Sequence, residues 1–209
     1  MGAGKSSIIN TILGSDMTSA VNRVGGKALE NTVEIKGKTY LLHDTVGLGE
    51  HSGMNGAEIV GKIYRLLTHL SDNGGVNLLI FVVRRNTPFE TMRKYYSLLH
   101  RGLCDSKVPI VIVVTGFESV RPNGDPWWTK NEGSLTEAGM SFDGHACVRT
   151  PKEGKTNTGH CHDENLVKES VGVLRELVVR CCMLTGWENV RYPYPRSLNL
   201  QNSLKNLSL

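Results

Sequence analysis

The first residues of the chain, MGAGKSS, combine small residues, a lysine and two hydroxyls at a spacing that suits phosphate. They match the end of the pattern G-x-x-x-x-G-K-[ST], in which small residues let successive backbone N–H groups converge on one phosphate. The Lys5 ammonium and the Ser6 hydroxyl would reach phosphate oxygens and Mg²⁺. The run IINTIL predicts a helix whose amino end favours an anion. The predicted phosphate-binding residues are Gly2, Ala3, Gly4, Lys5, Ser6 and Ser7.

Further polar positions follow in an order that fits a triphosphate site. The segment TVEIKGKTYLLHD contains two alternating runs, and Thr32 begins the first of them. It follows an uneven polar stretch, where a mobile loop that offers a threonine to Mg²⁺ would lie. The second run ends in DTVG, which places Asp44 at the carboxyl end of a strand, where ligands collect in open α/β sheets. Gly47 can present its backbone N–H to a terminal phosphate. We therefore predict Ser6, Thr32 and Asp44 as metal ligands, with Thr32 and Gly47 acting at the terminal phosphate.

The elements that must position these residues alternate between strand and helix. The apolar runs Val76 to Val83 and Val108 to Val114 are typical of parallel strands buried on both faces, and the helical spacing between them predicts a βαβ unit. Lys36-Gly37-Lys38 marks a hairpin of strands over 32–35 and 39–43. GAEIVGKIYRLLTHLSDNGG predicts a helix that ends at its glycine pair. The predicted fold is a three-layer α/β/α sandwich with a mostly parallel sheet.

The remaining segments carry weaker patterns. A long helix is expected over 164–184, whereas 117–144 and 150–163 are expected to be irregular apart from a short helix around Trp128. The cluster GHCHDE lacks a second ligand pair at metal-binding spacing, and we interpret it as an exposed loop. We predict one domain over 1–190 and a loose tail over 191–209.

Composition limits the partners that the chain can have. A net charge of +4 without a run of lysines or arginines argues against nucleic acid and favours a small anionic ligand. Five cysteines without CxxC spacing, and no secretory signal peptide, indicate reduced thiols in the cytoplasm. No apolar stretch reaches the roughly 20 residues of a transmembrane helix.

With these motifs in this order, the sequence resembles the translation-factor-related GTPases, in the group of septins and immunity-associated GTPases. MGAGKSSIIN and LLHDTVGLGE carry the likeness, and the chain looks most similar to G-domain proteins of fungi that also contain VTGFE-type and GHACV-type segments. The resemblance implies a Ras-like G domain that binds GTP or GDP with Mg²⁺. It assigns Lys5 and Ser6 to phosphates and metal, Thr32 to the first switch, and Asp44 and Gly47 to the second.

The guanine-binding segment departs from the pattern of this group. Most G domains have N/T-K-x-D after the strand, where this chain has Thr115, Gly116, Phe117 and Glu118. Glu118 keeps a carboxylate for the guanine N–H groups, and Gly116 lacks the lysine stem that lies over the base. Phe117 either stacks on the base or anchors the loop. GHACVRT would supply a backbone N–H to the base oxygen, from Cys147 or its neighbour, so a weakened guanine preference is expected.

The position that orients the attacking water also departs from the pattern of this group. Leu48 follows DTVG where a glutamine often orients the attacking water, and leucine cannot hydrogen-bond water. Glu50 and His51 are either catalytic or simply solvated. We expect slow GTP hydrolysis unless a partner or a second copy, paired through the nucleotide face, supplies a missing group. A pseudo-GTPase that binds nucleotide or an effector protein is the alternative, and an ATP-using small-molecule kinase is a weaker one.

The strand before the phosphate loop is also expected to be missing. In Ras-like sheets it lies between the strand that ends at Asp44 and the strand over Val76 to Val83. Its loss would expose two strand edges, whose unpaired groups cost about 1–3 kcal/mol each against a total stability of about 5–15 kcal/mol. We expect either that the natural chain starts further upstream or that this is a degenerate member of its group.

Overall fold

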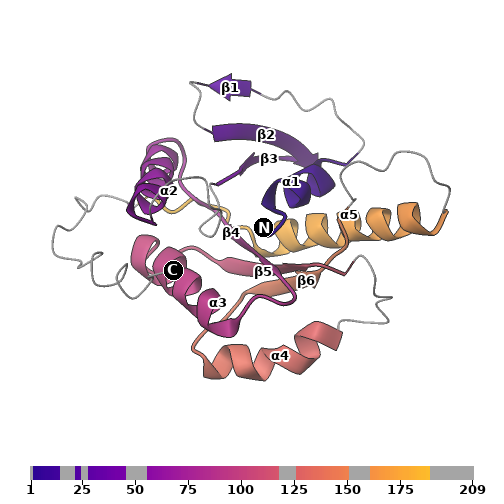
Figure 1. The fold of residues 1–209 in the computed structure, drawn as a ribbon. Helices are drawn as coiled ribbons and strands as arrows, with labels where there is room; N and C mark the ends of the chain where they lie inside the picture. The colour runs from indigo at the N-terminus through magenta and orange to yellow at the C-terminus, as the bar shows by residue number, and fades with distance from the viewer. Residues whose placement is uncertain are drawn as a thin grey trace.

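Strands and helices alternate along the chain (Figure 1). The computed structural model describes residues 2–14, 22–24, 28–45, 56–117, 126–150 and 161–188. Within these ranges the strands are β1 (Asn22–Val24), β2 (Ala28–Ile35), β3 (Lys38–His43), β4 (Leu79–Arg84), β5 (Ile110–Thr115) and β6 (Gly144–Cys147). The helices there are α1 (Lys5–Leu13), α2 (Gly56–Ser71), α3 (Phe89–Tyr96), the π-helix η1 (Ser97–Leu103), α4 (Pro126–Glu137) and α5 (Cys161–Cys181).

The sheet is divided in two. Among the described residues, β1, β2 and β3 form one antiparallel sheet and β4, β5 and β6 form a separate parallel sheet (Figure 1). A cavity of about 950 Å³ lies between the two sheets and is lined by both β3 and β4. No strand of the described ranges occupies this position. The expected lack of a central strand is therefore confirmed.

The parallel sheet is covered by helices on both faces. Every residue of β5 is buried, as expected for a central strand between two helical layers. Met92 of α3 and Leu135 of α4 pack with Ile112 on one face. On the other face Val113 packs with α1 and α5. The predicted three-layer α/β/α fold is confirmed, with an antiparallel sheet beside the parallel one.

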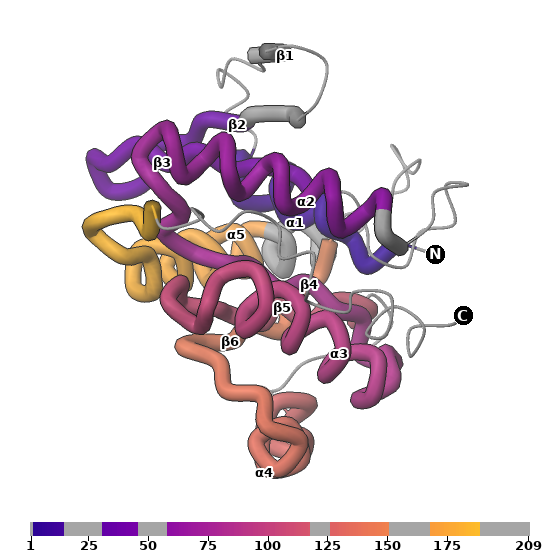
Figure 2. The backbone as a smooth tube through the Cα atoms, turned by 90° about the vertical axis from the view of Figure 1, so that its left-hand side faces the viewer, coloured from indigo at the N-terminus to yellow at the C-terminus, as the bar shows by residue number. Residues whose placement is uncertain are grey.

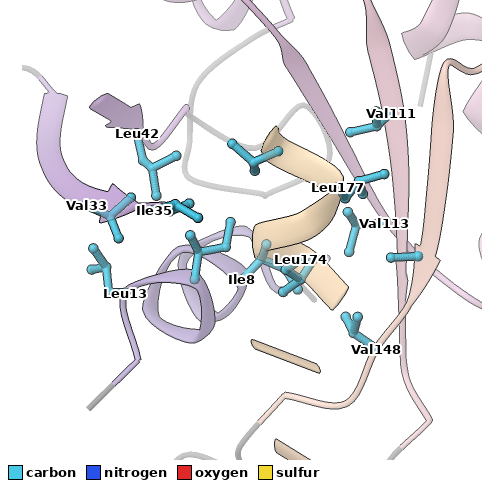
Figure 3. Packing of buried hydrophobic residues seen from close by; sticks show 13 residues of the cluster. Ile8, Leu13, Val33, Ile35, Leu42, Val111, Val113, Val148, Leu174 and Leu177 are labelled. Atoms are coloured by element: carbon cyan, nitrogen blue, oxygen red, sulfur yellow. The ribbon is translucent and has the colours of Figure 1, made fainter. Parts of the chain in front are cut away.

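Helices α1 and α5 connect the two sheets through one hydrophobic cluster. Figure 3 shows Ile8 of α1 and Leu174 of α5 between Leu42, from the antiparallel sheet, and Val113, from the parallel sheet. Arg175 adds a polar contact, because its guanidinium donates to the last carbonyls of α1, those of Ile12 (2.8 Å) and Leu13 (2.9 Å). Side-chain packing thus joins the two sheets, which share no strand pairing within the described residues.

Several elements differ from the sequence expectations. Strand β2 begins at Ala28 rather than at Thr32, because it pairs with β3 back to Glu30 and with β1 back to Ala28. The predicted βαβ helix is shorter, since α3 ends at Tyr96 and continues as the π-helix η1. The propensities of single residues do not predict which strands pair or how far the pairing extends.

Two segments expected to be irregular contain helix. Helix α4 covers 12 residues and begins with Pro126, which suits the first helical position. Trp128 of α4 stacks on His145 of β6 with ring centroids 4.1 Å apart, so this indole packs on the parallel sheet. Helix α5 begins at Cys161, so the GHCHDE segment is partly helical rather than a loop. No helix of the described ranges is both long and apolar enough to cross a membrane.

The thiol of Cys104 should be protected from alkylation in the folded protein. Cys104 is fully buried, and burial raises the pKa of this thiol from 9.0 to about 12. We expect iodoacetamide at pH 8 to modify the half-buried Cys181 first and Cys104 only after unfolding, as read by mass spectrometry. Equal rates in the native protein would contradict the burial. Because the unfolded thiol loses its proton first, Cys104 should lower the free energy of unfolding as pH rises from 9 towards 12.

Candidate phosphate-binding site

The amino end of α1 is open to an anion. Gly4 precedes the helix with φ +88°, a left-handed conformation that favours glycine. Its carbonyl accepts the first helical hydrogen bond, from the Ile8 N–H at 2.9 Å. Gly4 has no side chain with which to cap the helix, and the first turn of the helix contains no acidic residue. The N–H groups of Lys5, Ser6 and Ser7 are therefore those that an anion would meet at the positive end of the helix dipole.

Two predicted metal ligands lie together beside this helix end. The Ser6 hydroxyl donates to Asp44 Oδ2 at 2.5 Å, across 38 positions of sequence. Strand β3 ends at His43 and so delivers Asp44 to the start of α1. The contact is exposed to solvent. A hydroxyl and a carboxylate within reach of water are the hard oxygen donors that Mg²⁺ prefers, so these residues fit the predicted ion.

Thr115 ties the phosphate loop to the parallel sheet. Its hydroxyl has one proton to donate and lies within hydrogen-bond distance of two carbonyl oxygens, that of Ala3 at 2.9 Å and that of Val83 at 3.2 Å. The side chain is buried, at 3% exposure. Thr115 was predicted as a nucleotide-binding residue. In the structure its hydroxyl contacts the backbone of the phosphate loop at Ala3 and so helps to position this loop.

Replacing Thr115 with valine should destabilise the loop. Valine keeps the shape but removes the donor, so two largely buried carbonyls lose a partner. We expect the free energy of unfolding to fall by about 1–3 kcal/mol in urea denaturation. Thr115→Ser is the matched control, because it keeps the hydroxyl. Equal stability of the valine and serine variants would show that the hydroxyl contributes nothing.

The segment after β5 turns sharply beside two arginines. Gly116 has φ +95°, and a Cβ there would lie 3.7 Å from Arg84 Nε and 3.5 Å from Arg85 Cγ. Phe117 is only 7% exposed and packs with Met92 in the core, which supports its role as a loop anchor over base stacking. The Arg85 guanidinium carbon lies 5.9 Å from the centre of the Phe117 ring.

Sequence reasoning missed Arg84 and Arg85 as residues of this edge. A signal was present, because two cations directly follow an apolar run that predicts a parallel strand. Trp127 of α4 donates its indole N–H to the Arg85 carbonyl at 3.0 Å, which holds this position. The arginines therefore add positive charge to the edge that already holds Thr115 and Gly116.

The structure does not bring Thr32 to the site. Thr32 lies within β2, opposite Leu41, and Leu41 precedes Asp44 by three residues on β3. At about 3.3 Å per residue, Thr32 is about 10 Å along the sheet from Asp44. Thr32 was predicted as the first residue of its strand, beside a mobile loop, whereas β2 begins at Ala28 because it pairs with β3 back to Glu30 and with β1 back to Ala28.

The other predicted residues divide into two groups. Cys147 ends β6 opposite Val114, so it lies at the same carboxyl edge as Thr115. Gly47 and Glu118 lie outside the described residues, as do Leu48, Glu50 and His51.

A family comparison decides which class of protein carries this site. The family of 50S ribosome-binding GTPases matches residues 1–116, more than half of the chain. The chain belongs to this GTPase family. The matched region contains the phosphate loop, Asp44 and Thr115, so the GTPase assignment and the geometry concern the same part of the molecule. No curated protein matches the sequence.

A solved structure has the same fold as this chain. A mutation variant of SsGBP has a TM-score of 0.53 at 16% identity, covering 86% of this chain and 52% of its own. The complex of SsGBP with GDP has a TM-score of 0.47 at 17% identity, covering 85% and 48%. A GTP-binding protein from the hyperthermophilic archaeon Sulfolobus solfataricus, also with GDP, has a TM-score of 0.47 at 14% identity, covering 85% and 50%. The chain spans about half the length of these proteins.

Proposed function

We propose that this GTPase-family domain binds GDP and GTP with their phosphates at the amino end of α1. One observation carries the proposal: the structure joins Ser6 of α1 to Asp44, which follows β3, at 2.5 Å, at the amino end of a helix whose first turn contains no acidic residue. The Lys5 ammonium adds a positive charge at the same helix end. An anion there would be stabilised by the helix dipole, the backbone donors and Lys5 together.

Mg²⁺ is the proposed cofactor, with Ser6 and Asp44 as its protein ligands. When bound, Mg²⁺ would neutralise charge on the phosphates. Ser6 and Asp44 supply oxygen donors from two different elements. Ser6 would have to turn its hydroxyl proton away from Asp44 to offer a lone pair to the ion. Thr32 is no longer part of this proposal, because β2 holds it along the sheet.

We further propose slow GTP hydrolysis and use as a molecular switch. Gly47 remains our proposed contact to the terminal phosphate, and Glu118 the proposed acceptor for guanine N–H groups. Leu48 cannot orient a water molecule, so hydrolysis without a partner would be slow. Nucleotide binding without hydrolysis is the second candidate. The place of Thr32 within β2 favours it, because the site then lacks that residue at the terminal phosphate.

The finer assignments to a group and to partners are also proposals. Likeness to septins and to immunity-associated GTPases, and to fungal members in particular, rests on the motifs of the sequence. A homodimer through the nucleotide face and binding of an effector protein follow from that likeness alone. A cytoplasmic location follows from the cysteine pattern.

Competition between nucleotides tests the binding proposal. Fluorescent GDP should bind the chain, with GTP competing and ATP competing at least about tenfold more weakly. Removing Mg²⁺ with EDTA should weaken GTP, and Asp44→Asn should make GTP affinity much less dependent on Mg²⁺. Equal competition by ATP would favour the kinase alternative, and no saturable binding of either purine would overturn the proposal.

Single-turnover hydrolysis separates the two candidates. Phosphate release from bound GTP faster than in buffer supports a GTPase. Release at the buffer rate, with GTP fully bound, supports the binding module instead.

A further inference from the structure

The carboxyl end of β4 carries two arginines that fall on opposite faces of the parallel sheet. Figures 1 and 2 show α1 and α5 on one side of this sheet and α3 and α4 on the other. Side chains alternate along a strand, so Arg84 shares a face with Ile80 and Val82, which pack with α1 and α5. Arg85, the next residue, shares the opposite face with Val83, which packs with α3 and α4.

Arg84 therefore lies on the face that holds the phosphate loop. Its register partner on β5 is Thr115, whose hydroxyl lies 2.9 Å from the carbonyl oxygen of Ala3 in that loop. Gly116 follows Thr115, and a Cβ at Gly116 would lie 3.7 Å from Arg84 Nε. Because Gly116 has no side chain, the Arg84 guanidinium can lie along this edge of the sheet beside the phosphate loop.

The backbone of Arg84 is fixed by short contacts. Its N–H donates to Thr87 Oγ1 at 3.1 Å, and its carbonyl accepts from the Thr87 N–H at 2.9 Å. The next N–H, that of Arg85, donates to the Thr115 carbonyl at 2.9 Å. The Arg84 side chain is half buried, and no carboxylate of the described residues forms an ion pair with it. Its charge and its planar face are thus left for a ligand.

Arg85 has different surroundings. Its guanidinium carbon lies 5.9 Å from the centre of the Phe117 ring, which is itself buried against Met92 of α3. Its carbonyl accepts the indole N–H of Trp127 of α4 at 3.0 Å. Arg85 is therefore directed to the side of α3 and α4, away from the phosphate loop, and the two neighbouring arginines form a matched pair.

Given the proposed function, the metal site fixes the direction of a bound nucleotide. Asp44 follows β3 and contacts Ser6, so the ion and the outer phosphates would lie towards β3. The sugar and the base would then extend the other way, along the carboxyl ends of β4 and β5, where ligands of open α/β sheets bind. Arg84 and Gly116 lie on that path.

We propose that the Arg84 guanidinium stacks on the purine ring of the bound nucleotide. A guanidinium is planar, and its charge is attracted to the face of an aromatic ring. The Phe117 ring is 7% exposed and packs in the core, so it does not take this place. Every base presents a π-face, so such a stack contributes affinity without selecting guanine.

Replacing Arg84 with alanine should weaken GDP binding about 5- to 30-fold in calorimetric titration, since the stack is lost. ADP affinity should fall by the same factor. Inorganic pyrophosphate, which has phosphates but no base, should bind the parent and Arg84→Ala equally. Loss of pyrophosphate affinity would show that Arg84 contacts phosphate or supports the loop, and the proposal would be wrong.

Arg84→Gln keeps most of the stem and removes the charge, so it serves if the alanine variant does not fold. It should weaken GDP at least about threefold. Arg85→Ala should weaken GDP less than threefold, because this guanidinium faces Phe117. Equal losses from Arg85→Ala and Arg84→Ala would mean that the edge acts only through its net charge, which contradicts a stack.

Arg180→Ala is the control at the other end of the sheet. Arg180 is an exposed arginine of α5, and its Nη2 would lie 3.2 Å from a Cβ at Gly144, the first residue of β6. It is therefore at the amino edge of the parallel sheet, whereas Arg84 is at the carboxyl edge. GDP affinity of Arg180→Ala should stay within about twofold of the parent chain.

Failure of the stack and failure of nucleotide binding give different results. Parent affinity for GDP in both Arg84→Ala and Arg84→Gln would overturn the stack and leave the nucleotide site in place. No saturable binding of GDP to the parent chain would overturn the proposed function, and the stack with it.

Discussion

Replacing Lys5 with alanine should weaken the binding of GDP and GTP by about 30- to 150-fold. The reason is the loss of a charge-assisted contact to phosphate, which contributes about 2–3 kcal/mol. Titrating guanosine alongside GDP compares the change in affinity for a ligand without phosphates with the change for a ligand that carries them. Guanosine affinity, if measurable, should change little, because Lys5 lies at the helix end that we assign to phosphate.

Lys130→Ala is the matched control for this experiment. Lys130 is an exposed lysine of α4, so its loss changes the net charge equally without touching the site. Its GDP affinity should stay within about twofold of the parent chain, since surface substitutions usually change free energies by less than about 0.5 kcal/mol. If both lysine variants weaken GDP equally, the interaction is non-specific and the site is placed wrongly.

Replacing Leu174 with alanine should produce the largest loss of stability. Leu174 is 1% exposed and lies in the cluster that contains α1 and residues of both sheets (Figure 3). Removing it would leave a cavity where the two sheets are held only by side-chain packing. We expect a loss of about 2–5 kcal/mol in urea denaturation, a large part of a typical stability of 5–15 kcal/mol.

Val173 on the same helix provides the control for Leu174. It is adjacent in sequence but 44% exposed, so Val173→Ala removes methyl groups that are already partly in water. Its effect should be below about 0.5 kcal/mol. Comparable losses from Leu174→Ala and Val173→Ala would mean that the cluster does not join the sheets.

The sequence assigned Ser6 and Asp44 to one metal site, and the structure brings the two side chains together although 38 positions separate them. Both could be assigned to one site because each residue lies at the end of an element whose direction the pattern determines. An amphipathic helix after the glycines fixes Ser6, and a hairpin strand fixes Asp44 at the carboxyl edge.

Other features depend on contacts that local patterns do not contain. Thr32 was expected to begin its strand because the alternating pattern starts there, whereas pairing with β3 and then with β1 extends β2 back to Ala28. Helix α4 carries few apolar residues, and Leu135 and the Trp128 stack on His145 attach it to the parallel sheet. Such elements are selected by tertiary packing rather than by propensity.

The most direct test of the nucleotide site is an amide NMR titration of the ¹⁵N-labelled chain with GDP and Mg²⁺. The phosphates should shift the backbone N–H signals of Lys5, Ser6 and Ser7 most strongly and saturably, because these groups lie in the first turn of α1, at the positive end of the helix dipole. Saturable GDP binding that leaves these three signals in place, or no binding at any GDP concentration, would contradict the account.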